Sequence, residues 1–255
     1  MISTRSNLSF LVVIATVMTS LVVSAASTWY VSPSGNDSNS GKMETSAFKT
    51  IQKAIDSAAA KDTVLVKEGT YSRITIPKSK AGLIVRAVGN AEKTIINGPG
   101  RCVTIADGTV TNIYVEGFTL TGGWLGSRGM DGAGALGGTY NNCIITGNSC
   151  STDAGGAKYC TLNGCTISNN SCSDWHGGIE YCIASNCVIS GNKSTGVGAG
   201  GAKSSILIEC KITNNSGGSG GGGADSCTLY RCLFSGNTRT QSELPGKDIN
   251  GGDGL

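Results

Sequence analysis

A short phrase that recurs at a nearly constant spacing constrains the fold of this chain more than any other feature. Each of its five copies is six residues long, begins with Cys and ends with Asn, and successive copies start 22 or 23 residues apart. Gly-Gly pairs such as Gly155-Gly156 keep the same period. Self-similarity of this kind is typical of solenoids, in which each repeat packs against its neighbours. The copies are Cys143–Asn148, Cys165–Asn170, Cys187–Asn192, Cys210–Asn215 and Cys232–Asn237.

The residues inside the repeat decide between two solenoids of this period, a leucine-rich horseshoe and a parallel β-helix. The repeats lack the recurring Leu of a horseshoe and carry apolar residues two apart, as in Cys165 and Ile167, between Asn-Gly, Asn-Asn or Gly-Gly turns. Short strands with right-handed connections wind into a coil whose turns lie about 4.8 Å apart. The sequence predicts an all-β fold, a single-stranded right-handed parallel β-helix with about 22 residues per rung.

Equivalent residues of successive rungs should stack in columns. An inward aliphatic column would contribute about 1.5–3 kcal/mol per buried side chain. An Asn column is expected at a turn, where Asn tolerates left-handed backbone and amides bond along the stack, and we interpret it as structural. A column of alternating charge is interpreted as solvated salt bridges. The members are Ile145, Ile167, Ile189, Ile212 and Phe234; Asn148, Asn170, Asn192, Asn215 and Asn237; and Lys158, Glu180, Lys203 and Asp225.

The first 25 residues read as a secretory signal peptide. Arg5 precedes an apolar run, Leu11–Val23, and the small residues Ser24-Ala25 form a cleavage site before Ala26. The alternative is an uncleaved membrane anchor, but the run is shorter than the roughly 20 residues that a span needs. No second apolar segment follows, so we expect no transmembrane span in the mature chain, and a protein that is secreted or displayed at the cell surface.

The composition suits stacked turns and argues against nucleic-acid binding. The chain has 39 Gly, 5% aromatic and 15% charged residues, which fits many tight turns and small stacked side chains. Its net charge of +3 is spread along the sequence. A nucleic-acid partner requires a basic stripe, which this sequence does not offer.

The eleven cysteines follow the repeat, which bears on their redox state. Export would favour disulfides, but the cysteines lie in columns, and Ser205 takes the place of one Cys in phase. This pattern indicates buried small side chains, mostly as thiols, with a disulfide or two between neighbouring rungs left open. Zinc binding and Cys–His catalysis are less favoured, because His176 is the only histidine.

The sequence divides into a cap, regular repeats and a tail. Residues 26–121 contain the first irregular rungs and an amphipathic helix around Thr45–Ala60 that would cap the first rung. Regular repeats occupy 122–237, and a polar tail occupies 238–255. The tail offers no comparable cover, which leaves a truncated chain or end-to-end association through the last rung as alternatives.

Several segments resemble known proteins. Trp29–Gly41, Phe48–Ile55 and Asp62–Tyr71 are similar to the start of bacterial β-helix proteins of the pectate-lyase-like superfamily. The Gly-Gly-Ala phrases and Phe234–Asn237 resemble repeats of polymorphic outer-membrane proteins and autotransporter passengers. The resemblance covers nearly the whole mature chain and implies the fold. It implies no one activity, because this scaffold carries polysaccharide lyases, hydrolases, adhesins and surface proteins.

The resemblance implies what a lyase would need, namely acidic calcium ligands and a Lys or Arg base. Asp131, Asp153 and Asp174 are the candidate acids, and Arg128 and Lys158 are the candidate bases. A hard cation prefers several clustered carboxylates, so calcium is only weakly predicted, at Asp153 and Asp174, and no cofactor is required. A hydrolase would need two carboxylates from neighbouring rungs, and no motif identifies them. The catalytic residues are therefore unknown.

An irregular segment, 124–134, marks the predicted binding patch, because function in solenoids concentrates in projecting loops. Trp124 and Trp175 would stack on sugar rings while nearby acids bind hydroxyls or calcium; the alternative is that both Trp only shield the core edge. We predict a scaffold that binds a polysaccharide or cell-surface glycan without a catalytic site; the alternative is a calcium-dependent, pectate-lyase-like enzyme on acidic glycans. The patch comprises Trp124, Arg128, Asp131, Asp153, Asp174, Trp175 and His176.

Overall fold

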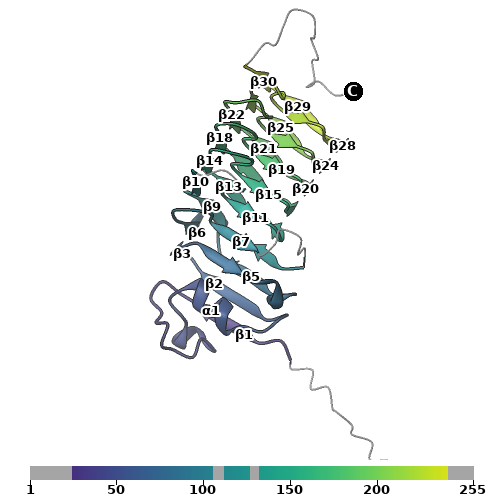
Figure 1. Cartoon of the computed structure of the whole chain (residues 1–255). Helices are drawn as coiled ribbons and strands as arrows, with labels where there is room; N and C mark the ends of the chain where they lie inside the picture. Colours follow the sequence, from purple (N-terminus) through teal and green to yellow (C-terminus); the bar gives the residue numbers. More distant parts are fainter. Residues whose placement is uncertain (1–24, 106–111, 127–131, 241–255) are drawn as a thin grey trace, which may run out of the picture.

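The structure, a computed structural model, describes residues 25–105, 112–126 and 132–240. Over these residues the chain is a right-handed parallel β-helix of about 8 turns with about 22 residues per turn, which confirms the predicted fold. Figure 1 shows the turns stacked into one elongated body with its helix at the N-terminal end. Most of the predicted signal peptide lies outside the described residues, as do Arg128 and Asp131.

Four parallel sheets, which we call A to D, form the walls of the solenoid in the part of the chain that the structure describes. Each strand pairs with its equivalent one turn earlier and one turn later. Sheet A contains β1 (Thr28–Val31), β2 (Thr63–Lys67), β5 (Ile84–Val88), β8 (Tyr114–Glu116), β12 (Thr139–Asn141), β16 (Thr161–Asn163), β20 (Ile183–Ser185), β24 (Ile206–Ile208) and β28 (Thr228–Tyr230). Sheet B contains β3 (Gly69–Tyr71), β6 (Thr94–Asn97), β9 (Thr119–Thr121), β13 (Ile144–Thr146), β17 (Thr166–Ser168), β21 (Val188–Ser190), β25 (Lys211–Thr213) and β29 (Leu233–Ser235).

In each regular turn the chain passes through sheets A, B, D and C in that order, so the short strands of sheet D form a corner between B and C. Sheet C contains β4 (Ile74–Ile76), β7 (Val103–Ile105), β11 (Ala135–Leu136), β15 (Ala157–Lys158), β19 (Ile179–Glu180), β23 (Ala202–Lys203) and β27 (Ala224–Asp225). Sheet D contains β10 (Trp124–Leu125), β14 (Ser149–Cys150), β18 (Ser171–Cys172), β22 (Lys193–Ser194), β26 (Ser216–Gly217) and β30 (Thr238–Arg239).

The aliphatic column fills the interior as the repeat predicted. Ile145 pairs in register with Ile167, and Ile167 with Ile189, and all three are fully buried. Ile212 continues the column, and Phe234 packs against it from the last turn. Residues about 22 apart in the sequence are therefore vertical neighbours, and the core is a line of stacked side chains.

The asparagine column lies inside the solenoid and is hydrogen-bonded from end to end. Asn170 donates its side-chain Nδ2 and its backbone N–H to Oδ1 of Asn192, each at 3.0 Å, and its Nδ2 also reaches the Ile145 carbonyl at 2.9 Å. The left-handed residue of each turn is the one before the column, for example Asn169 (φ 54°) or Gly191 (φ 64°). Our reason for Asn here was therefore half wrong, because the amide, and not backbone tolerance, sets the requirement. The buried members are Asn148, Asn170, Asn192 and Asn215.

None of the eleven cysteines, all of which lie in the described residues, is in a disulfide. Cys143, Cys165 and Cys187 follow one another in the core, and the N–H of Cys165 points at the Cys187 sulfur at 3.3 Å. In the second column the N–H of Cys182 donates to Oγ of Ser205 at 3.0 Å. Ser and Cys occupy this position because both offer a small side chain that accepts that bond.

The N-terminal helix is shorter than the sequence suggested. A 3-10 helix, η1 (Glu44–Ser46), and α1 (Ile51–Ser57) replace the continuous helix predicted around Thr45–Ala60. Thr50 caps α1 by accepting the Lys53 N–H, and the backbone turns extended at Ala58. The helix buries Ile51, Ala54 and Ile55 against β1, β2 and β4 and so covers the first turn. The remaining 3-10 helices are η2 (Lys78–Lys80) and η3 (Ala91–Lys93).

The described residues contain no helix that is both long and apolar enough to cross a membrane.

Candidate functional site

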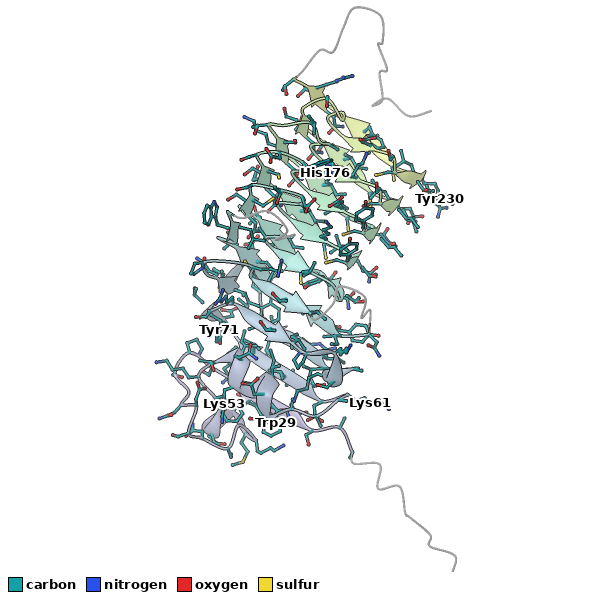
Figure 2. All side chains as sticks on the ribbon, viewed as in Figure 1. Trp29, Lys53, Lys61, Tyr71, His176 and Tyr230 are labelled. Carbon is teal, nitrogen blue, oxygen red and sulfur yellow. The ribbon has the colours of Figure 1, made fainter. Side chains whose placement is uncertain are left out.

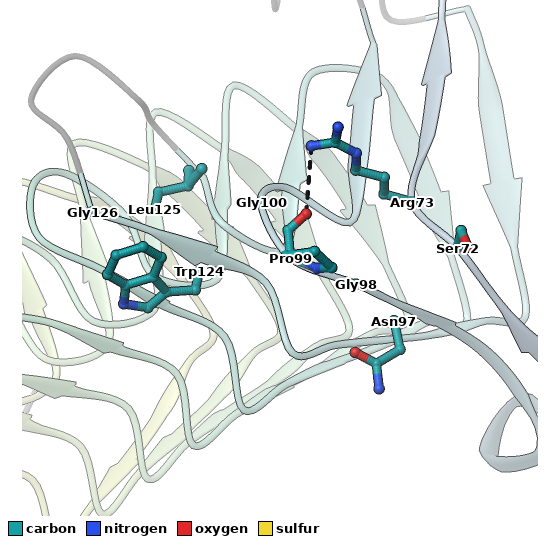
Figure 3. A pocket seen from close by; sticks show the side chains of 9 residues that line it. All are labelled: Ser72, Arg73, Asn97, Gly98, Pro99, Gly100, Trp124, Leu125 and Gly126. Carbon is teal, nitrogen blue, oxygen red and sulfur yellow. Dashed lines mark hydrogen bonds between the residues drawn. The ribbon is translucent and has the colours of Figure 1, made fainter.

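The predicted patch separates into two places, and the first is a groove at the base of the corner between sheets B and C. We call this corner, made of the turns that leave sheet B and the strands of sheet D, the D corner. The groove has a volume of about 670 Å³. Figure 3 shows Trp124 and Arg73 on either side of the Pro99 turn. The described residues that line it are Ser72, Arg73, Asn97, Gly98, Pro99, Gly100, Trp124, Leu125 and Gly126.

The groove opens where the asparagine column stops. Gly123 occupies the position that Asn148 holds one turn later, directly before the sheet D strand. Its N–H donates to Oδ1 of Asn148 at 2.9 Å and terminates the column. A side chain at Gly123 would run into the Ala133 carbonyl, because a Cβ there would lie 2.2 Å from that oxygen. The regular turn therefore gives way to a bare backbone at this point.

Two glycines keep the groove residues in position. A Cβ on Gly126 would lie 2.3 Å from the Trp124 ring, so the indole lies across a position that only glycine leaves open. Gly100 has φ +86°, a conformation that suits glycine, and a Cβ there would lie 2.7 Å from Nη1 of Arg73. The Gly100 carbonyl accepts the Trp124 N–H at 3.0 Å, which joins the two neighbouring turns.

The groove offers a cation, an amide and an exposed aromatic face. Trp124 is 63% exposed, and Arg73 donates one bond, to the Pro99 carbonyl at 3.4 Å, with its other N–H groups directed at the groove or solvent. Of the described residues that line the groove, Arg73 alone is charged, and none is acidic. A guanidinium recognises carboxylates through paired hydrogen bonds, and an indole presents a broad apolar face. The arrangement can bind a planar or cyclic acidic ligand.

The second place is a buried charged cluster beside sheet C, where our interpretation of the charge column as solvated was wrong. Lys158 and Glu180 are each only 5% exposed. The Lys158 Nζ lies 3.1 Å from Glu180 Oε2 and 3.5 Å from Asp153 Oδ2. Residues on neighbouring turns do alternate in charge, but the column turns inward under the loops that lead into sheet C. A buried pair of this kind is costly to break because each ion depends on the other.

His176 completes this cluster as a neutral side chain. It is 2% exposed, its Nδ1 accepts the Ala199 N–H at 3.1 Å, and its Nε2 lies 3.7 Å from Glu180 Oε1. Burial lowers the pKa of His176 to about 4, and the Lys203 cation lowers it further. Nε2 therefore carries the proton and faces Glu180 at neutral pH. Figure 2 places His176 among the stacked turns, away from both ends of the molecule.

The structure brings together some of the predicted patch residues and separates others. Asp153, which adopts the left-handed backbone (φ +66°), and His176 meet around Lys158 and Glu180. Trp175 packs edge-on against His176 at 5.9 Å between ring centroids and is 47% exposed.

Asp174 lies on the exposed turn beside Trp175, whereas Trp124 lies two turns below in the groove. Among the described residues, no group of three or more His, Cys, Asp or Glu side chains could hold a metal ion. Calcium at Asp153 and Asp174 remains a prediction, since Asp153 lies against an ammonium group in the structure.

Sequence reasoning missed Arg73, Asn97 and Pro99. They come from irregular turns, so no repeated copy marks their position, and they are 24 or more residues apart from each other or from Trp124 only by chance of loop length. The one available signal was Gly98-Pro99-Gly100, a strong turn sequence.

Comparisons with known proteins support the fold and leave the activity open. No protein-family model and no curated protein sequence matches this chain. The crystal structure of pectate lyase Pel9A is similar with a TM-score of 0.51 and 15% identity, over 85% of this chain and 65% of the lyase. The GH136 lacto-N-biosidase from Eubacterium ramulus matches with a TM-score of 0.48 and 12% identity, over 82% of this chain and 56% of that protein. This chain thus spans less than two thirds of either protein.

A third match, pectin methylesterase from Aspergillus niger, has a TM-score of 0.48 and 12% identity, over 88% of this chain and 92% of the esterase. At these identities the similarity to the pectate lyase shows a shared pectate-lyase-like β-helix fold and nothing about substrate. The resemblance to autotransporter repeats remains a prediction.

Proposed function

We propose that this protein is an extracellular scaffold that binds acidic polysaccharide along its D corner without cleaving it. The observation that carries the proposal is the groove in which an exposed indole, Trp124, stands opposite an exposed guanidinium, Arg73. A uronate ring stacked on Trp124 would place its carboxylate within reach of Arg73. The extracellular location rests on the predicted signal peptide.

The D corner continues beyond the groove in a direction that suits a linear polymer. Trp124, Ser149, Ser171 and Lys193 form one outward column in register, with neighbours about 4.8 Å apart along the axis. Trp175 is exposed on the turn that follows the third member. A glycan that lies parallel to the axis would meet Arg73 and Trp124 first, then two hydroxyls, and then Lys193.

Binding without turnover fits the chemistry of the two places. The described lining of the groove has no carboxylate to act as an acid, a base or a calcium ligand. The acids Asp153 and Glu180 lie against Lys158, which neutralises them within the cluster. A lyase would require one of these groups to reach the substrate.

Titration of the purified protein with polygalacturonate and alginate, followed by calorimetry, tests the proposal. Trp124→Ala and Arg73→Ala should each weaken binding at least tenfold, and a neutral glucan should bind poorly to the wild type. Arg231→Ala removes an exposed arginine that pairs with Glu209 on another face and serves as the matched control. Equal affinity of Arg73→Ala and wild type would overturn the proposal. A rise in the ultraviolet absorbance of unsaturated uronates with added calcium would replace it with the lyase alternative.

A further inference from the structure

Two cysteines stand apart from the core columns. Cys150 and Cys172 are register neighbours on β14 and β18 of sheet D, and they share a small buried cluster with Leu125 and Ala133. Their column has Leu125 one turn below and Ser194 one turn above. Each thiol therefore has one sulfur neighbour in this column, whereas Cys165 lies between two other cysteines in the core column.

The spacing of this pair permits a covalent bond. Residues in register on neighbouring parallel strands have Cα atoms about 4.8 Å apart. Disulfides form when the Cα atoms are roughly 4.4–6.8 Å apart. The two strands are two residues long and lie at a corner, next to the exposed turn Ser173–Trp175, so the backbone here can adjust more easily than in the core sheets.

The surroundings of Cys172 favour its thiolate. The Trp175 N–H points at the Cys172 sulfur at 3.4 Å. Ser194, fully buried on the next turn, has a hydroxyl with no hydrogen-bond partner among the described residues, so it can donate to a negative sulfur below it. The Cys150 thiol lowers the pKa of Cys172 most, and the N–H groups of Trp175 and Asp174 add to this, while burial opposes it.

The core thiols have the opposite character. Hydrogen bonding with the Cys165 sulfur raises the pKa of Cys187 to about 12, and burial adds to the effect. The Cys143 thiol likewise raises the pKa of Cys165. Thiolate character and access decide which cysteines react with oxidants. The corner pair and the core pair thus share the same register geometry and differ in reactivity.

We propose that Cys172 and Cys150 form a redox-reactive pair in which Cys172 is oxidised by hydrogen peroxide and Cys150 resolves the product to a cross-turn disulfide. The Cys172 thiolate attacks one peroxide oxygen, the O–O bond breaks, and hydroxide leaves with a sulfenic acid on Cys172. The Cys150 sulfur then attacks the Cys172 sulfur, the S–O bond breaks, and water leaves with the proton of Cys150 and the hydroxyl. Two thiols lose two electrons, and one peroxide becomes two waters.

The disulfide would act on the exposed face of the D corner. Forming it moves the Cys172 sulfur toward Cys150 and weakens the acceptor of the Trp175 N–H. Trp175 is half exposed on this turn, so its fluorescence should report the oxidation.

The test treats the reduced, folded full chain with stoichiometric hydrogen peroxide, quenches it with an alkylating agent, unfolds it, and maps the peptides by mass spectrometry. Cys150 and Cys172 should appear as one linked peptide pair, while Cys165 and Cys187 remain alkylated thiols. Cys150→Ser should accumulate a sulfenic acid at Cys172 that dimedone traps, and Cys172→Ser should give neither product. Ser194→Ala should slow the oxidation several-fold.

Two results would overturn the proposal. In the first, Cys150 and Cys172 stay reduced while the chain is folded. In the second, Cys165 and Cys187 oxidise at the same rate as the corner pair, which would show general exposure of thiols. Cys165→Ser is the matched control and should leave the corner disulfide unchanged. The wild-type map decides the matter even if a variant fails to fold.

Discussion

The regular turns from Asn148 upward and the irregular turns below Gly123 use the same four-sided coil for opposite purposes. In the regular turns every position is repeated, so the amide of Asn170 or Asn192 closes the corner from within. Below Gly123 that amide is missing, and the corner is hollowed into the groove with Arg73 and Trp124. Repetition thus supplies stability, and the place where repetition fails supplies a binding surface.

The largest difference between the two regions should appear when one residue is deleted. Removal of Thr166 from β17 shifts every later inward residue of that turn to the other face, so the cooperative thermal transition should be lost. Removal of Pro99 from the groove turn should keep a cooperative transition and weaken glycan binding. Far-ultraviolet circular dichroism during heating measures both. A Thr166 deletion that melts like the wild type would show that the turns are not coupled by register.

Charge pairs should separate the regions next. Lys158→Met strands the buried Glu180 and should cost about 4 kcal/mol of unfolding free energy. Arg86→Met breaks the pair between Arg86 and Glu116, at 2.6 Å in the irregular turns, where the arginine side chain is about half exposed. It should cost less than about 1 kcal/mol. Urea unfolding of both variants provides the comparison, and equal costs would contradict the burial of the regular pair.

Acid should affect the regular turns through His176. The ordinary pKa of histidine, near 6.5, applies in the unfolded chain, whereas the folded value is about 4, so the neutral form is the one that folding favours. Its stabilising effect is complete above pH 6.5 and is lost as the pH falls toward 4, by up to ~3 kcal/mol. His176→Asn should flatten this part of the profile of unfolding free energy against pH. An unchanged slope would mean that other groups dominate.

The asparagines give the smallest contrast. Asn192→Ala leaves the Asn170 backbone N–H and side-chain Nδ2 without their acceptor in the core and should cost about 2 kcal/mol. Asn97→Ala, on the exposed floor of the groove, should change stability by less than about 0.5 kcal/mol and reduce affinity for polygalacturonate instead. Chemical unfolding and calorimetry on the same samples distinguish the two outcomes. A stability loss at Asn97 as large as at Asn192 would remove the distinction.

The fold could be predicted from the sequence because the information was repeated. The spacing of Ile145, Ile167 and Ile189 specified strand register directly, and the structure has that register. The groove could not be predicted in the same way, because Arg73 and Asn97 occur once each and are brought beside Trp124 by turns of unequal length. The helix was overestimated because Phe48 and Ala58 share its spacing while lying outside it.

The charged cluster shows a different limit. Alternating signs at Lys158 and Glu180 identified neighbours correctly, but a sequence pattern gives the order of side chains along a column and not the depth at which they lie. Depth came from the loop that carries Asp153 and from His176, which fold back over sheet C. Only the three-dimensional path of those loops reveals it.

The interruption at Gly123 also makes the length of the molecule an adjustable quantity. Because each asparagine above it bonds only to its immediate neighbours, a duplicated segment of 22 residues, such as Asn170–Ser190 with its following Gly191, would enter the stack as one more storey. The body would grow by about 4.8 Å per copy while the hollow at its foot kept its shape. Gene duplication could thus set how far the protein reaches without altering what it holds.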